Sequence, residues 1–167
     1  MRSIKSLFLL TLAFGVITLN SCKKDKDTTP SGTISASVNG TATDFSTGAL
    51  AGKASVNGIT LTTIQGTAAN KTGISIALYG TVTAGKTYSN NASNDDDKPI
   101  LIFETNDDQY FNDDASTTNV VSVTITSVSS TEIAGTFKGD LVTIAAGNDA
   151  PKTKSITNGK FNVKITK

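Results

Sequence analysis

The chain has 167 residues and a nearly balanced charge, with 15 lysines and arginines against 14 aspartates and glutamates. Arg2 is its only arginine, so the sequence offers no basic segment on which nucleic-acid binding could rest. Histidine is absent, which excludes Ser-His and Cys-His catalytic pairs and imidazole-bound zinc.

The first 21 residues have the layout of a secretory signal peptide. Arg2 and Lys5 precede an apolar stretch over residues 7–19, and Ser21 supplies the small residue at the predicted cleavage site. A membrane-spanning helix is one alternative, but the stretch is well short of the ~20 apolar residues that such a helix needs. A buried core helix is the other alternative, and no later segment has the pattern of a helical partner.

Cys22 is the only cysteine, and it directly follows the predicted cleavage site, which therefore resembles the lipobox of bacterial lipoproteins. The resemblance implies that the Cys22 thiol is acylated and becomes the new N-terminus, so that lipid anchors the mature chain to a membrane. With its one thiol committed to lipid, the domain forms no disulfide and depends on its hydrophobic core.

We therefore expect a signal peptide over residues 1–21, a lipidated flexible tether over 22–32, and a single domain over 33–167. Cleavage removes two of the 15 basic residues and leaves 13 against 14 acidic ones, a formal net charge near −1. Lys23 stands where many Gram-negative lipoproteins carry a retention Asp, so the resemblance implies the outer membrane. The charged run over residues 23–27 resembles the tether of Bacteroidota lipoproteins that reach the cell surface.

Beyond Gly32, apolar and polar residues alternate, as in strands with one buried face. The alternation is clear over residues 34–38, 74–78, 121–125 and 133–137, and no later segment has helical periodicity. Turn signals recur about every 8–12 residues. The sequence predicts an all-β domain, an antiparallel meander of about eight to ten strands that forms a closed or nearly closed calycin-like barrel or a β-sandwich. The unbroken apolar run over residues 100–103 predicts a strand covered on both sides or at the barrel closure.

Three Asn-Gly pairs, at residues 39–40, 57–58 and 158–159, lie between alternating segments. Asn-Gly favours the type I′ hairpin turn. Across the second and third pairs, the flanking apolar residues are an odd number of positions apart. Both can face the core only if the chain turns or bulges there. Phe137 and Phe161 are the strongest core candidates.

Two polar, acidic segments interrupt the alternation, at residues 90–98 and 106–119. Carboxylates are suitable calcium ligands, although neither segment has EF-hand spacing. If residues 99–105 form one strand, its ends lie about 20 Å apart and the two segments cannot share an ion. The candidate calcium site is therefore local, and hydrated acidic loops are the alternative. Its ligands would be Asp107, Asp108, Asp113 and Asp114.

Tyr88, Tyr110 and Phe111 are candidate contacts for a binding partner, because aromatic side chains bury a large area with few torsions. The alternative for Tyr110 and Phe111 is that they attach their loop to the core. Glu104 or Glu132 would be one member of the carboxylate pair of a two-carboxylate hydrolase, but each has the sequence context of an ordinary charge at a strand edge.

The sequence also resembles a group of uncharacterised Bacteroidota lipoproteins. The resemblance rests on the lipobox, the first strand over residues 36–40, the Gly-Thr-Tyr-like turn over 85–88, the Gly-Thr-Phe strand over 133–137 and the Asn-Gly-x-Phe ending over 156–163. These segments occur in the same order. The resemblance implies a fold and an address in the cell envelope, and no activity.

We therefore expect a lipid-anchored envelope protein with a non-enzymatic binding or structural role, at the outer membrane or cell surface. We expect no cofactor beyond the lipid on Cys22. Membrane contact through that lipid and an unidentified envelope ligand or protein are the expected partners. A calcium-stabilised surface module and a two-carboxylate hydrolase are the alternatives.

Overall fold

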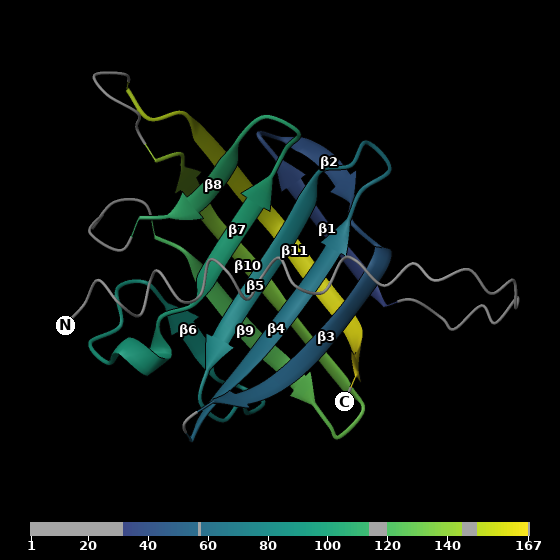
Figure 1. Ribbon diagram of the computed structural model, residues 1–167, viewed down its shortest axis with the longest axis vertical. Helices are drawn as coiled ribbons and strands as arrows, with labels where there is room; N and C mark the ends of the chain where they lie inside the picture. Colours follow the sequence, from purple (N-terminus) through teal and green to yellow (C-terminus); the bar gives the residue numbers. More distant parts are fainter. Residues whose placement is uncertain (1–31, 57, 114–119, 145–149, 167) are drawn as a thin grey trace, which may run out of the picture.

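The alternating segments form β-strands, as predicted, and the computed structural model describes residues 32–56, 58–113, 120–144 and 150–166 (Figure 1). The all-β prediction is confirmed. In chain order the elements are β1 Thr33–Val38, β2 Thr41–Asp44, β3 Thr47–Val56, β4 Ile59–Thr67, β5 Gly73–Tyr79, β6 Thr87–Ser89, the 3-10 helix η1 Asp95–Asp97, β7 Ile100–Glu104, β8 Gln109–Asn112, β9 Ser122–Val128, β10 Glu132–Val142 and β11 Thr153–Thr166.

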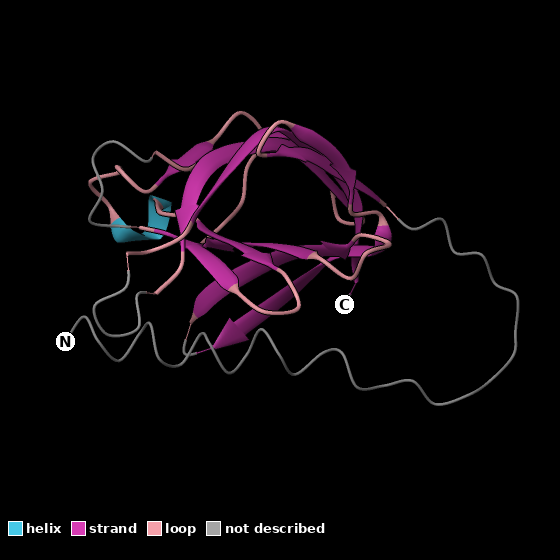
Figure 2. Ribbon diagram, turned by 90° about the horizontal axis from the view of Figure 1, so that it is seen from above, coloured by secondary structure: helices cyan, strands magenta, loops and turns pink. Residues whose placement is uncertain are grey.

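The eleven strands of the described residues belong to one sheet, in the order β2-β1-β11-β3-β4-β5-β7-β8-β10-β9-β6. An additional pairing between β10 and β11 links seven of them into a ring, formed by β11, β3, β4, β5, β7, β8 and β10. The strands curve around a common interior when the molecule is seen from above (Figure 2). Paired strands are antiparallel except β11 and β3. The count exceeds the expected eight to ten because β2, β6 and β8 have only three or four residues, too few to show a clear alternation.

The Asn158-Gly159 pair lies inside β11, where it forms a bulge and not a hairpin turn. Asn158 has a φ of 54°, and the pairing register shifts beside it on both neighbouring strands, β1 and β10. A Cβ on Gly159 would lie 2.6 Å from Cδ2 of Phe137, so glycine is required there. The bulge allows Ile156 and Phe161, which are separated by an odd number of positions, both to face the core.

The first Asn-Gly pair forms the predicted hairpin turn between β1 and β2. Asn39 and Gly40 have φ values of 48° and 82°, as a type I′ turn requires. Gly58, with a φ of 79°, lies in the turn between β3 and β4. Its partner Asn57 falls outside the described residues.

The core is formed by buried side chains from every strand except β2. Phe137 and Phe161 are both 3% exposed, so their prediction as core residues is confirmed. Phe45, between β2 and β3, is fully buried and meets Phe103 edge to face, with ring centroids 6.2 Å apart. Aromatic pairs at this separation add to the stability from burial alone.

Strand β7 departs in part from expectation, because its outer side is only half covered. Leu101 and Phe103 face the interior and are buried, whereas Ile100 and Ile102 are half-buried. Ile102 pairs with Phe111 of β8 within the same layer. The outer face of β7 is therefore only partly covered. The alternative, a place at the closure of the sheet, is nearer to what is observed, because β7 lies next to β8, which pairs with β10 to complete the ring.

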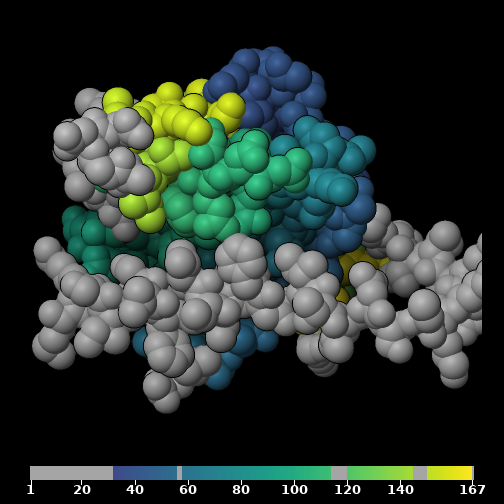
Figure 3. Space-filling view, turned by 45° about the horizontal axis from the view of Figure 1, so that its top comes forward, coloured from purple at the N-terminus to yellow at the C-terminus, as the bar shows by residue number. Residues whose placement is uncertain are grey.

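Several turns gather at one end of the ring. In the space-filling view, the start of β11 (yellow) lies beside both the β1–β2 hairpin (purple to blue) and the β7–β8 hairpin (green) (Figure 3). No helix among the described residues is long and apolar enough to cross a membrane.

Candidate functional site

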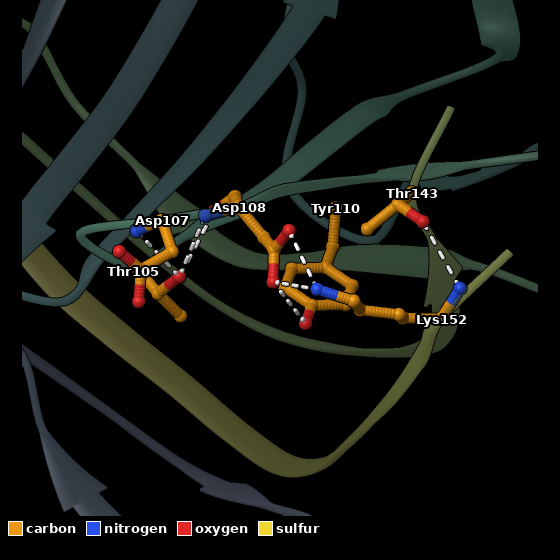
Figure 4. A network of polar contacts seen from close by, with 6 residues as sticks. All are labelled: Thr105, Asp107, Asp108, Tyr110, Thr143 and Lys152. Atoms are coloured by element: carbon orange, nitrogen blue, oxygen red, sulfur yellow. Dashed lines mark hydrogen bonds and ion pairs between the residues drawn. The ribbon is translucent and has the colours of Figure 1, made fainter. Parts of the chain in front are cut away.

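A polar network joins the turn between β7 and β8 to the start of β11 (Figure 4). The turn itself is organised by Thr105, whose Oγ1 accepts hydrogen bonds from the backbone N–H groups of Asp107 at 3.3 Å and Asp108 at 3.0 Å. The side chain of Asp108 then accepts from Lys152 Nζ, which lies 3.0 Å from Oδ1 and 2.8 Å from Oδ2. Tyr110 completes the network by donating its hydroxyl to Asp108 Oδ2 at 3.3 Å.

The charges of this network stabilise one another. The hydrogen bond from Lys152 holds the pKa of Asp108 below its ordinary value of 3.8. The same bond raises the pKa of Lys152. Burial of the ring is the main cause of the raised pKa of Tyr110, and the neighbouring Asp108 adds to it. At neutral pH the network is therefore an ion pair capped by a neutral phenol.

The network lies where the ring has little backbone pairing. β8 and β10 pair through only two residue pairs, Leu141 with Asn112 and Val142 with Phe111. Lys152 is held next to this short contact between β8 and β10, the seam of the ring, because its backbone N–H donates a hydrogen bond to Thr143 Oγ1 at 3.0 Å. The ion pair thus joins strands across the seam, which is a structural task.

The three described acids of the candidate calcium site, Asp107, Asp108 and Asp113, do not come together as expected. Asp107 and Asp108 precede β8, whereas Asp113 follows it, and a step of five extended residues covers roughly 17 Å. The backbone carbonyl of Asp113 accepts from Asn90 Nδ2 at 3.1 Å, at the far end of β8 from the network. Asp114 falls outside the described residues. Within the described residues, no group of three or more carboxylate, thiol or imidazole side chains could hold a metal ion.

The aromatic candidates lie in different surroundings from those expected. Tyr88 is fully buried and Tyr110 is 4% exposed, so neither offers a surface to a partner. Tyr110 packs on Phe103, with ring centroids 6.0 Å apart. This contact agrees with the alternative that Tyr110 attaches its segment to the core. Phe111, on the opposite side of β8, is half-buried. The exposed-contact prediction is therefore wrong for both tyrosines, because alternation along β6 and β8 directs them inward.

Tyr88 takes part in a second ion-pair network, next to η1. Lys86 Nζ lies 2.6 Å from Asp97 Oδ1 and 4.6 Å from the centre of the Tyr88 ring. Burial raises the pKa of Tyr88, and the bond to Asp97 raises the pKa of Lys86. This contact fastens η1 to the end of β6.

The two glutamates lie far apart. Glu104 ends β7 and accepts a hydrogen bond from Nε2 of Gln109, its pairing partner in β8. It therefore lies near the end of β10, because Val142 pairs with Phe111, two residues further along β8. Glu132 begins β10, and the ten steps from there to Val142 span roughly 33 Å. The carboxyl groups of a retaining or inverting glycosidase lie within about 10 Å of each other. These two residues therefore do not form such a pair.

A polar surface on the outer side of β6, β9, β10, β11 and β1 was not found from the sequence. Thr136 of β10 pairs in register with Lys160 of β11 and with Thr124 of β9. The same row of paired residues continues to Ser35 of β1 and to Thr87 of β6. The alternation of residues 160–164 is visible in the sequence, but the neighbouring strands are not. We name this surface the lysine face; it comprises Ser35, Thr87, Thr124, Glu132, Thr136, Lys138, Asp140, Lys160, Asn162 and Lys164. Asp44 of β2 pairs with Ser35 beside it, so acidic side chains lie among its lysines.

Ser21 and Cys22 fall outside the described residues, so the lipidation site rests on the sequence. Comparisons of the chain with protein-family models, with curated proteins and with solved structures return no match. The resemblance to Bacteroidota lipoproteins therefore remains a hypothesis from sequence motifs.

Proposed function

We propose that this protein is lipid-anchored in a bacterial cell envelope and has a non-enzymatic binding or structural role there. The observation that carries the proposal is Cys22, the only cysteine, placed directly after a basic start, an apolar stretch and a small residue. Lipid on that thiol gives stable anchoring when more than one acyl chain is attached. The motifs shared with uncharacterised Bacteroidota lipoproteins support an outer-membrane or cell-surface address.

The non-enzymatic part of the proposal is supported by the chemistry of the side chains. The chain has no histidine. Its two glutamates lie far apart, Glu132 at the start of β10 and Glu104 at the end of β7, and Asp108 is paired with Lys152 in a contact that joins strands. The ring interior is occupied by buried aliphatic and aromatic side chains. We therefore assign the role to the outer surface of the domain.

A single substitution tests the anchor. Replacing Cys22 with Ala removes the acceptor thiol, so the chain is expected to lose labelling by a palmitate analogue and to move from the detergent phase to the aqueous phase. Ser21→Ala is the matched control, because alanine keeps a small residue at the cleavage site and is expected to leave labelling unchanged. Continued labelling of Cys22→Ala would overturn the proposal.

A further inference from the structure

The seam between β8 and β10 has the fewest residue pairs of any antiparallel junction among the described strands of the ring. Only Leu141 with Asn112 and Val142 with Phe111 pair across it. By contrast, β4 has eight residue pairs with β3 and seven with β5. Proteins open locally where few contacts must break, while strands with many contacts stay closed until the whole domain unfolds. The seam is therefore the weakest of these antiparallel junctions.

Strand β8 is tied more firmly to β7 than to β10. Three residue pairs join β7 and β8. Asn112 adds two side-chain bonds, since its Oδ1 accepts from the N–H of Leu101 at 2.8 Å and its Nδ2 donates to the carbonyl of Pro99 at 3.2 Å. At the other end of β8, Gln109 donates its side-chain amide to Glu104. A strand held in this way stays with β7 when its contact with β10 breaks.

Two lysines hold the β7–β8 hairpin from the other side of the seam. Lys152 Nζ lies 2.8 Å from Asp108 Oδ2, with side chains 65% and 26% exposed. Lys154 Nζ lies 5.5 Å from the centre of the Tyr110 ring. Both lysines belong to the start of β11, so these contacts supplement the short pairing of β8 with β10. An ion pair between exposed groups is weak, and it can be broken without loss of the fold.

The other short junction of the ring, between β11 and β3, is reinforced. It also has two residue pairs. Thr166 Oγ1, however, donates to the carbonyl of Ala51 at 3.1 Å, and the N–H of Gly32 donates to the carbonyl of Ala49 at 3.2 Å. Gly32 leads directly into β1, which pairs with β11 through five residues. β3 is thus connected to β11 both directly and through β1, which leaves the seam as the place where the ring can part.

We propose that the ring opens at the seam while the rest of the sheet stays folded, and that Asp108 and Lys152 form the latch that keeps it closed. The β7–β8 hairpin moves as one unit in this opening. Its movement frees the pairing edges of β8 and β10 and exposes Tyr110 and Leu141, which are 4% and 0% exposed in the closed ring. The inference rests on the strand pairing and does not depend on the lipid anchor.

Hydrogen exchange of the backbone amides, measured on the full chain under native conditions, tests the opening. Among residues 111, 112, 141 and 142, the N–H groups that bond across the seam are expected to exchange at least about tenfold faster than those that join β4 to β5. The N–H groups that join β8 to β7 should exchange more slowly than those of the seam, because the hairpin stays intact.

Substitutions test the latch. Asp108→Asn and Lys152→Gln are each expected to speed exchange at the seam several-fold and to leave exchange between β4 and β5 unchanged. Because both remove the same contact, the double variant should be no faster than either single variant. Asp97→Asn is the matched control, since it breaks the ion pair with Lys86 next to η1, away from the seam. It should leave exchange at the seam as in wild type.

Two results would overturn the proposal. Exchange at the seam that is as slow as exchange between β4 and β5 would show that the ring opens only when the whole domain unfolds. An equal increase at the seam and between β4 and β5 in Asp108→Asn would show that the ion pair stabilises the whole domain and is not a latch.

Discussion

Gly135 of β10 lies against the ring of Phe161 of β11, so closely that a Cβ on the glycine would be 2.5 Å from Cζ of the phenylalanine. The same Cβ would also press on the backbone carbonyl of Thr124 in β9. Three neighbouring strands therefore meet at a position where no side chain fits. The Gly-Thr-Phe and Asn-Gly-x-Phe motifs, separate in sequence, are two halves of one packing contact.

Gly135→Ala is accordingly expected to destabilise the domain by about 1–3 kcal/mol, the usual cost of overpacking a filled core. Gly52→Ala is the control, since a Cβ there meets nothing within 4 Å. Urea unfolding of the two variants checks the difference. Equal midpoints would show that the sheet relaxes around the added methyl group.

Truncating Phe161 or Phe137 to Ala should cost about 3–5 kcal/mol, because each removes a buried ring from the core. Thr136→Ala, on the exposed side of β10, should change stability by no more than roughly 0.5 kcal/mol. Thermal and denaturant unfolding measure both. A loss below about 1 kcal/mol for either phenylalanine would contradict the packing described for β10 and β11.

The pair between Asp108 and Lys152 should make stability depend on acid pH. The pKa of Asp108 is lowered in the folded chain, so its contribution is present above its unfolded value near 3.8 and is lost as pH falls through the folded pKa. The melting temperature of Asp108→Asn should therefore lie slightly below that of wild type at neutral pH and converge with it in acid. Asp96→Asn, an exposed change of equal charge on η1, should show no such convergence.

Calcium at millimolar concentration should leave the melting temperature unchanged. Asp108 is already paired with Lys152, and Asp113 lies at the other end of β8. The measurement compares the melting temperature of the wild-type protein in calcium with its melting temperature in a chelator. A stabilisation that disappears on changing Asp107, Asp108, Asp113 and Asp114 to Asn would restore the calcium-stabilised module.

Local patterns in the sequence were sufficient for the strands and for part of the core. Alternation placed Phe137 and Phe161 in the interior, and Asn39-Gly40 had the backbone preferences of its turn. The strand predicted between the two acidic segments is present as β7, so residues 90–98 and the described part of the second segment, residues 106–113, lie at its opposite ends.

Pairing between distant strands could not be predicted in the same way. Tyr88 is buried because β6, only three residues long, pairs with β9. Asn158-Gly159 becomes a bulge because β11 continues through it to pair with β1 and β10 together. The lysine face likewise exists only once β10 and β11 are neighbours. Each of these three features depends on which strands pair with one another, and the sequence of a single strand does not determine its pairing partners.

The mass of the intact protein purified from membranes tests the central claim most directly. The account predicts a chain that begins at Cys22, lacks residues 1–21 and carries the added mass of a diacylglyceryl group and an N-acyl chain. A chain that begins at any other residue, or one with an unmodified thiol at Cys22, would contradict it.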